Sequence, residues 1–387
     1  MAVGRLSQQA IRGLMVAGAH LSPKIGNSSP LWVFGGASGR SYSDNCRITH
    51  ERVLRTRPDV EPVWVIDRDS ADVAEVAQAG RYAFRGSLHA HRLARSAAVI
   101  VFSHGVQDVP GMMWSGGALR VRLGHGLTAF GKTRGRTSRS VRRMTDAVDL
   151  APVASVMEQD HKAEWGFPRS KLPITGLPRW DAMLAERAVV GARERPLVLY
   201  APTSRPWHTA ADASPHGALR PIHDLLTSPR LQTLLADGAF DLAVYFHQIT
   251  RFRFGTFDWL PPGVEIIQEE AVLPRLIAAA SLVMSDYSSI LWDALYLDTP
   301  VVFFQFDRDE HVRLRGSYLD LDARLFGPNA DTPSEALDAL EAAVGDGFKL
   351  ACWQEDRQGW QDSAFAFRDD QNAARVVAAI EERLDRA

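Results

Sequence analysis

His125 is the residue best suited to acid–base chemistry in the first half of the chain. It follows a predicted strand at 118–123, and it lies between Gly124 and Gly126. Glycines on both sides let the backbone turn sharply and let a substrate come close. An imidazole titrates near neutral pH, so it can take a proton from an attacking hydroxyl. A structural histidine is the alternative, and His104, which also follows a strand and precedes a glycine, competes for the same role.

A serine-rich turn in the second half is suited to holding an anion. It covers residues 285–289, between a short apolar run at 282–284 and a helical pattern at 290–297. Ser288 and Ser289 would stand at the start of that helix, where free backbone N–H groups and the helix dipole attract phosphate. Simple capping of the helix by these serines is the alternative.

Other polar side chains lie at or near predicted strand ends in the same half. Parallel sheets bind ligands beyond the carboxyl ends of their strands, so such residues are candidates for phosphate contacts. The candidates are Thr203, Ser204, Arg205, His247, Asp286 and Arg315. An arginine can hold phosphate with its planar fork, and a histidine can stabilise or protonate a leaving phosphate. Exposed surface residues are the alternative for the two arginines and for His247.

The segment 120–143 is strongly basic. It holds eight Lys and Arg residues, Lys132 among them, and no acidic residue. Such a segment attracts a polyanion or an anionic membrane surface. Because His125 lies within it, we expect it to receive an anionic acceptor, with a solvated surface helix as the alternative.

A series of short stretches carries a family resemblance. They are SYSDNCR at 41–47, HG at 125–126, TGLPRWD at 175–181, LYAPTSR at 199–205, the strand-end His247, SDYSS at 285–289, TPVVFFQFD at 299–307, RLRGSYLD at 313–320 and FRDDQNA at 367–373. In this order they resemble the motifs of the CDP-glycerol glycerophosphotransferases, enzymes that prime or polymerise teichoic acids and related capsular polymers. The resemblance covers the chain from about residue 31 to its end.

The resemblance implies that His125 is the catalytic base and His247 a second essential histidine. The substrate-contacting residues that it implies are Gly126, Lys132, Thr203, Ser204, Arg205, Asp286, Ser288, Ser289 and Arg315. The chain departs from the family pattern at four places, one of which is residues 127–132, where the family has Thr-Pro-Leu-Lys after the glycine. Gly124 and Ser204 each stand where the family has Trp, and Gln248 follows His247 in place of Pro.

Strands alternate with helical stretches along the whole chain, which predicts an α/β protein with parallel sheets wound on both sides. The charged, poorly periodic stretch 186–196 separates two such series. We therefore expect two domains, residues 1–190 for the acceptor and residues 191–387 for the CDP-alcohol. Two such doubly wound domains facing across a cleft make the GT-B-like fold, which the resemblance also implies.

Composition and charge indicate which partners and which cellular compartment to expect. The formal net charge of −2 gives no argument for a nucleic-acid partner. Cys46 and Cys352 form no metal motif and no disulfide framework, as is typical of cytoplasmic proteins. No apolar run approaches the roughly 18 residues that span a bilayer. Residues 1–24 are basic and free of acids, which favours an amphipathic helix on the inner membrane face or on the domain, with a signal peptide as the alternative.

We predict a transferase that moves glycerol phosphate, or a similar polyol phosphate, from a CDP-alcohol to a hydroxyl of a polyanionic or lipid-linked polymer and releases CMP. No metal or other cofactor is expected to be required, and Asp307–Asp309 is expected to be a loop rather than a metal site. The alternatives are a glycosyltransferase that uses a nucleotide-sugar and a non-catalytic polymer-binding protein. Glycerol and ribitol donors are not distinguished by the sequence.

Overall fold

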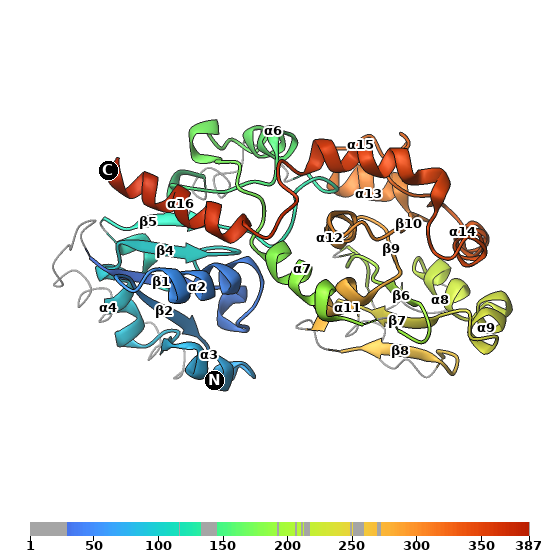
Figure 1. Cartoon of the computed structure of the whole chain (residues 1–387), viewed down its shortest axis with the longest axis horizontal. Helices are drawn as coiled ribbons and strands as arrows, with labels where there is room; N and C mark the ends of the chain where they lie inside the picture. The colour runs from blue at the N-terminus through green and yellow to red at the C-terminus, as the bar shows by residue number, and fades with distance from the viewer. Residues whose placement is uncertain are drawn as a thin grey trace. The chain divides into compact units, whose positions relative to one another are not determined.

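The computed structural model describes residues 29–115, 117–132, 145–191, 193–205, 207–209, 212, 217–247, 250, 259–268 and 272–386. The helix expected within residues 1–24 and the basic segment beyond Lys132 lie outside these ranges. The chain divides into two compact units, each built on one parallel sheet (Figure 1). Unit 1 comprises Met1–His125, Gly135–Asp181 and Asp369–Ala387, and unit 2 comprises Gly126–Arg134 and Ala182–Arg368.

Unit 1 holds a five-stranded parallel sheet in the order β3-β2-β1-β4-β5. The strands are β1 (Leu31–Gly35), β2 (Glu61–Ile66), β3 (Arg81–Phe84), β4 (Val99–Phe102) and β5 (Leu119–Arg122). The helices are η1 (Ala37–Gly39), α2 (Asp44–Thr56), α3 (Val73–Ala79), α4 (Leu88–Ser96), η2 (Met112–Trp114), α6 (Val156–Glu164), η3 (Arg169–Lys171) and α16 (Asn372–Asp385). Successive residues of β1 enter two different apolar clusters, because helices cover both faces of the sheet.

Unit 2 holds a six-stranded parallel sheet in the order β11-β10-β9-β6-β7-β8. The strands are β6 (Leu197–Tyr200), β7 (Asp241–Tyr245), β8 (Val264–Ile267), β9 (Leu282–Ser285), β10 (Val301–Phe304) and β11 (Asn329–Ala330). The helices are α8 (Arg220–Leu226), α9 (Pro229–Ala236), α11 (Leu273–Ala279), α12 (Ile290–Tyr296), α13 (Arg308–Arg315), α14 (Pro333–Gly345), η6 (Ala351–Trp353) and α15 (Gln354–Ala364). The helix α7 (Arg179–Val189) carries the chain from unit 1 to unit 2.

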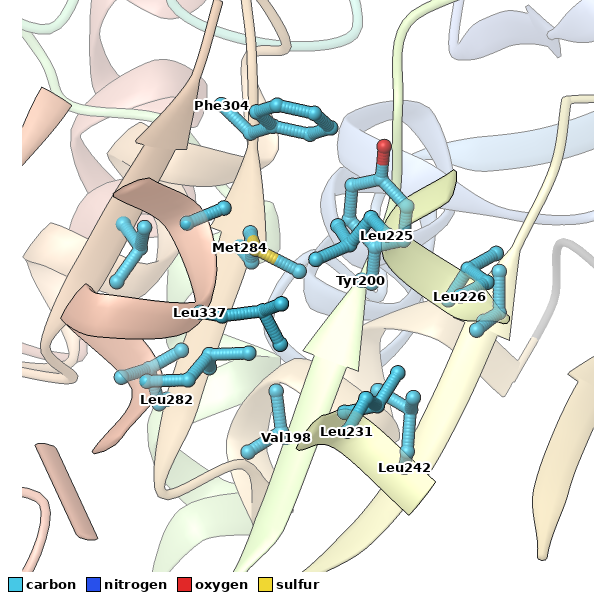
Figure 2. Close-up of a cluster of buried hydrophobic side chains, with 14 of the residues drawn as sticks. Val198, Tyr200, Leu225, Leu226, Leu231, Leu242, Leu282, Met284, Phe304 and Leu337 are labelled. Atoms are coloured by element: carbon cyan, nitrogen blue, oxygen red, sulfur yellow. The ribbon is translucent and has the colours of Figure 1, made fainter. Parts of the chain in front are cut away.

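One apolar cluster of unit 2 shows how its sheet is covered. Figure 2 shows Val198 and Tyr200 of β6 and Met284 of β9 beside leucines of the overlying helices, among them Leu225 and Leu337. All five side chains are at most 3% exposed. This core fixes the central strands, and therefore the loops at their carboxyl ends that carry the predicted site residues.

The division into units differs from the predicted boundary near residue 190 at three places, the first being that unit 2 already resumes at Ala182. The last helix, α16, belongs to unit 1, because Val376 and Ile380 on its apolar face pack into the same cluster as Trp32 and Phe34 of β1. Residues 126–134, which follow His125, belong to unit 2. The amphipathic period of α16 was visible in the sequence, but a period does not specify which sheet a helix covers. The predicted class of two doubly wound parallel sheets is confirmed.

Among the described residues, no helix combines the length and the hydropathy that a bilayer crossing demands.

Candidate functional site

His104 and His125 lie together at the carboxyl ends of β4 and β5. These strands are neighbours in the sheet, so the loops that follow them leave it at the same edge. The two imidazoles stack with their ring centroids 4.6 Å apart and their planes inclined by 8°. The two histidines that competed for the role of base therefore form one pair.

The loop that carries His104 is held by Asp108. This buried carboxylate accepts hydrogen bonds from the backbone N–H groups of Ser103 (3.0 Å) and His104 (2.7 Å). Its other oxygen accepts the N–H of Ser38 at 2.7 Å. The Ser103 hydroxyl in turn lies 2.7 Å from Nδ1 of His104. Sequence reasoning missed Asp108, although a carboxylate four residues after a strand-end histidine is a recognisable turn-forming pattern.

The backbone of His125 is held by two residues from distant stretches of the chain. Asn45 donates from Nδ2 to the carbonyl of Gly124 at 3.2 Å, and Arg179 donates from Nη1 to the carbonyl of His125 at 2.8 Å. Oδ1 of Asn45 also accepts the backbone N–H of Arg179 at 2.9 Å, so the two residues that hold the His125 backbone are bonded to each other. Three of the stretches quoted for the family resemblance thus meet at His125, a convergence that their sequence spacing does not reveal.

The surroundings of His125 keep its imidazole neutral. The protein around the ring, followed by the facing His104, lowers the pKa of His125 to about 4, with smaller contributions from Arg122 and Arg179. A neutral imidazole can accept a proton. His125 is therefore already in the form that a general base requires at cellular pH.

In unit 2, Arg205 and Asp286 form a buried ion pair. Arg205 is 3% exposed, and its Nη2 lies 2.8 Å from a carboxylate oxygen of Asp286. The same guanidinium makes two hydrogen bonds to Asp307, at 2.5 and 2.8 Å. Asp286 also accepts the backbone N–H of Thr203 at 2.9 Å. This placement differs from the direct phosphate contact predicted for Arg205, because its buried guanidinium already binds two carboxylates.

Tyr287 and His311 extend this network. The Tyr287 hydroxyl donates to Asp307 at 3.2 Å, and its ring stacks on the imidazole of His311 with centroids 3.6 Å apart. His311 donates from Nε2 to the carbonyl of Phe130 at 2.9 Å. The network therefore fastens the segment that follows His125 onto unit 2. Sequence reasoning missed His311, since it lies inside α13, away from any strand end.

The segment 126–132 brings several predicted site residues together within unit 2. Gly126 lies against Ser289, so closely that a Cβ atom at Gly126 would stand 2.6 Å from the Ser289 hydroxyl. The N–H of Lys132 donates to the carbonyl of Gly316 at 3.3 Å, beside Arg315. Arg315 is exposed and, among the described residues, forms no ion pair or side-chain hydrogen bond. Its guanidinium therefore remains available to an anion, and the substrate contact of Arg315 stays a prediction.

The serine-rich turn does not behave as a simple helix cap. Ser289 is the residue before α12, yet its side chain makes no capping hydrogen bond. Ser288 accepts the N–H of Ile290 at a long 3.4 Å. The hydroxyls of Thr203 and Ser204 are buried and have no hydrogen-bond partner among the described residues. These hydroxyls lie at the carboxyl ends of the adjacent strands β6 and β9 and remain candidates for ligand contacts.

His247 follows β7, which pairs with β6, so it too lies at the carboxyl edge of this sheet. Its side chain is half-buried. Gln248, the departure from the family pattern, lies outside the described residues. The role of His247 stays a prediction.

The contact between Gly126 and Ser289 gives a testable expectation. In Gly126→Ala the added methyl group must displace Ser289 or the segment 126–132, and overpacking of this kind costs about 1–3 kcal/mol of unfolding free energy. Adding Ser289→Gly should restore most of the loss. Gly359→Ala is the matched control, because a Cβ there meets nothing within 4 Å. Urea denaturation of the four proteins measures these differences, and equal stability of Gly126→Ala and the wild type would contradict the contact.

Comparisons with known proteins place this arrangement in a family. The family model described as CDP-Glycerol:Poly(glycerophosphate) glycerophosphotransferase matches residues 27–382. The teichoic acid poly(glycerol phosphate) polymerase of Bacillus subtilis (strain 168) is 26% identical over 188 residues, which are 48% of this chain and 24% of that protein. The teichoic acid glycerol-phosphate primase of Bacillus spizizenii is 29% identical over 125 residues, 32% of this chain and 29% of that protein. The chain spans only about a quarter of the length of these two relatives.

Solved structures show a similar fold. The structure of the wall teichoic acid polymerase TagF matches with a TM-score of 0.76 at 14% identity, covering 99% of this chain and 95% of that chain. The S. aureus MnaA–UDP co-structure matches with a TM-score of 0.57 at 12% identity, covering 92% and 96%. At these identities the likeness concerns the fold, and it confirms the predicted GT-B-like class.

Proposed function

Because the chain belongs to the CDP-glycerol:poly(glycerophosphate) glycerophosphotransferase family, we propose that it transfers glycerol phosphate from CDP-glycerol to a hydroxyl of a teichoic-acid-like polymer. One observation carries the proposal beyond family membership. His125, neutral and held by its backbone, is joined by a single peptide bond to Gly126, which packs against Ser289 at the start of α12. The candidate base is thus followed in the chain directly by the residue that packs on the candidate phosphate site.

The reaction needs one proton transfer and one displacement at phosphorus. The imidazole of His125 takes the proton of the acceptor hydroxyl as its oxygen attacks the phosphorus that bears glycerol. A new P–O bond to the acceptor forms, the P–O bond to the CMP phosphate breaks, and CMP leaves with the bonding electrons. Ser288 and Ser289 hold the diphosphate, while His247 and Arg315 stabilise the charge that develops on its oxygens.

Binding of the anionic substrates would also adjust the base. A negative charge beside an imidazole raises its pKa, because it favours the protonated form. His125 would therefore be neutral before substrate binds and a stronger base once phosphates surround it. The bound phosphates would thus raise the proton affinity of His125 when the acceptor hydroxyl has to be deprotonated. No change in the fold is needed for this.

We also propose that the protein works in the cytoplasm at the inner face of the membrane, where a CDP-linked donor and a lipid-linked acceptor could meet. The basic segment 120–143 and the basic residues 1–24 support this proposal by their charge. Sedimentation with anionic liposomes tests it, and loss of binding after reversal of Arg136, Arg139 and Arg142 would assign the contact to that segment. Unchanged binding of that variant would remove the segment from the membrane contact.

The activity is tested by offering the purified chain different donors. CDP-glycerol, CDP-ribitol and a nucleotide-sugar are each incubated with and without a glycerol phosphate oligomer, and the released nucleotide is identified. Acceptor-dependent release of CMP from a CDP-alcohol is the expected result. Release of a nucleoside diphosphate from the nucleotide-sugar would instead identify a glycosyltransferase. No turnover of any donor would favour a polymer-binding protein.

The proposed donor site predicts a change in binding. Ser288→Ala combined with Ser289→Ala should weaken CDP-glycerol binding, because each hydroxyl hydrogen bond to a charged oxygen is worth about 1.5–3 kcal/mol. Isothermal titration of the folded variant with CDP-glycerol measures the loss. Ser334→Ala, at an exposed position in α14, is the control and should bind like the wild type. Unchanged affinity in the double variant would remove the two serines from the donor site.

A further inference from the structure

Arg122, the last residue of β5, carries a buried guanidinium that has no anionic partner. Its side chain is 8% exposed. Among the described residues it makes no hydrogen bond or ion pair, and its Nε atom is buried without an acceptor. Burying an unpaired charge is costly, so proteins seldom retain one without a use.

The groups around Arg122 do not supply the missing counter-charge. The ring of Trp165 lies 5.5 Å from the guanidinium carbon, a cation–π contact that carries no net charge. The carboxylates whose charges act on Arg122 are those of Asp108 and Glu158. Asp108 is engaged by backbone N–H groups, and Glu158 by Lys162 at 3.2 Å and the N–H of Ala154 at 2.7 Å.

Acidic side chains are also absent from the sequence of the undescribed part of unit 1. Residues 1–28 and 133–144 contain no Asp and no Glu. Within unit 1, no acidic side chain outside the described residues can therefore supply the counter-charge of Arg122.

Arg122 also lies at the proposed catalytic edge of the sheet. It pairs in register with Phe102, the last residue of β4, so His104 and His125 follow closely on the two neighbouring strands. Arg122 contributes to the lowered pKa of His125, after the surrounding protein and His104. A Cβ atom at Gly124, the residue before His125, would meet nothing within 4 Å.

We propose that Arg122 binds a phosphate group of the acceptor chain and so presents the neighbouring acceptor hydroxyl to His125. This inference rests on the proposed function and specifies its acceptor subsite. A phosphodiester or phosphomonoester anion supplies the missing charge, and its oxygens match the fork of a guanidinium. The donor residues proposed above lie in unit 2, so the anion assigned to Arg122 is that of the acceptor.

The test compares two arginines of the same strand. Arg122→Gln and Arg120→Gln remove the same charge, but Arg120 is paired with Asp149 at 3.0 Å. Each full-length variant is titrated calorimetrically with a glycerol phosphate oligomer and, separately, with CDP-glycerol. Arg122→Gln should bind the oligomer about tenfold more weakly or worse, as expected for a charge-assisted hydrogen bond, and should bind CDP-glycerol normally. Arg120→Gln should bind both like the wild type.

A stability measurement separates this role from a structural one. In Arg122→Met an apolar side chain replaces the unpaired charge over Trp165, so the thermal midpoint should equal or exceed that of the wild type. A lower midpoint, together with normal oligomer binding by Arg122→Gln, would make Arg122 a structural residue and overturn the inference. Weaker CDP-glycerol binding with normal oligomer binding would overturn it too, since the anion would then be the donor's.

The two proposals fail in different ways. If the wild type releases CMP from CDP-glycerol but Arg122→Gln binds the oligomer normally, the acceptor subsite is wrong and the proposed function stands. If the oligomer binds through Arg122 but no CMP is released, the anion site stands and the proposed transferase activity is wrong.

Discussion

His125→Ala is expected to lower turnover by about a hundredfold or more, because a positioned general base contributes about 10²–10⁴-fold to rate. The variant should remain folded, since Asn45 and Arg179 hold the backbone rather than the imidazole. The measurement is the initial rate of CMP release at saturating CDP-glycerol and acceptor. His104→Ala is the control and should be much milder, because it removes the stacking partner and not the base. A His125→Ala enzyme with wild-type turnover would contradict the assignment.

The pH dependence offers a second readout for the same residue. The profile of kcat/KM reports the free enzyme, so its acid limb should lie well below 6.5, towards the lowered pKa of about 4. The profile of kcat reports the substrate complex, in which neighbouring phosphates raise the pKa, so its acid limb should lie higher. In His104→Ala the limb of kcat/KM should move up, because a charge that opposes protonation is lost. Identical limbs in all profiles would assign the titration to another group.

Arg205→Ala is expected to destabilise the protein by about 3–5 kcal/mol, because it leaves buried carboxylates without their counter-charge. Arg205 pairs with Asp286 at 2.8 Å and with Asp307 at 2.5 Å, and Asp286 in turn holds the backbone of Thr203. Urea denaturation should show a large fall in the transition midpoint. Activity should also fall, since the turn that leads to Ser288 would lose its support.

A matched surface cluster serves as the control. Arg230 also pairs with two carboxylates, those of Asp338 and Glu341, but these groups are exposed. Exposed ion pairs contribute little, so Arg230→Ala should leave the midpoint close to that of the wild type. If Arg205→Ala and Arg230→Ala lowered the midpoint equally, burial would not be what makes the Arg205 network important.

The features that the sequence predicted well were those with local patterns. Short apolar runs such as 282–284 and 301–306 predicted the buried strands, and the polar residues after them predicted the edge at which the site residues lie. Gly126 was singled out from its place in a motif, and the structure gives its physical reason as close packing against Ser289.

The features that escaped prediction depend on which distant segments meet. Arg205 looked like a phosphate-binding arginine, since nothing nearby in the sequence shows that Asp286 and Asp307 would bury it. Asn45 and Arg179 are 134 residues apart, and only the fold joins them at His125. Arg122 looked like one of several basic residues in the segment 120–143. Its distinction, a buried charge without a partner, exists only in three dimensions.

In the proposed reaction, glycerol and the phosphate attached to it move together from the donor to the acceptor. The most direct test uses CDP-glycerol labelled at the phosphorus that bears glycerol, incubated with the full chain and a glycerol phosphate oligomer. The label is expected in the lengthened oligomer, and the released nucleotide is expected to be unlabelled CMP. Label recovered in released CDP, with glycerol alone transferred, would contradict attack at phosphorus and with it the proposed mechanism.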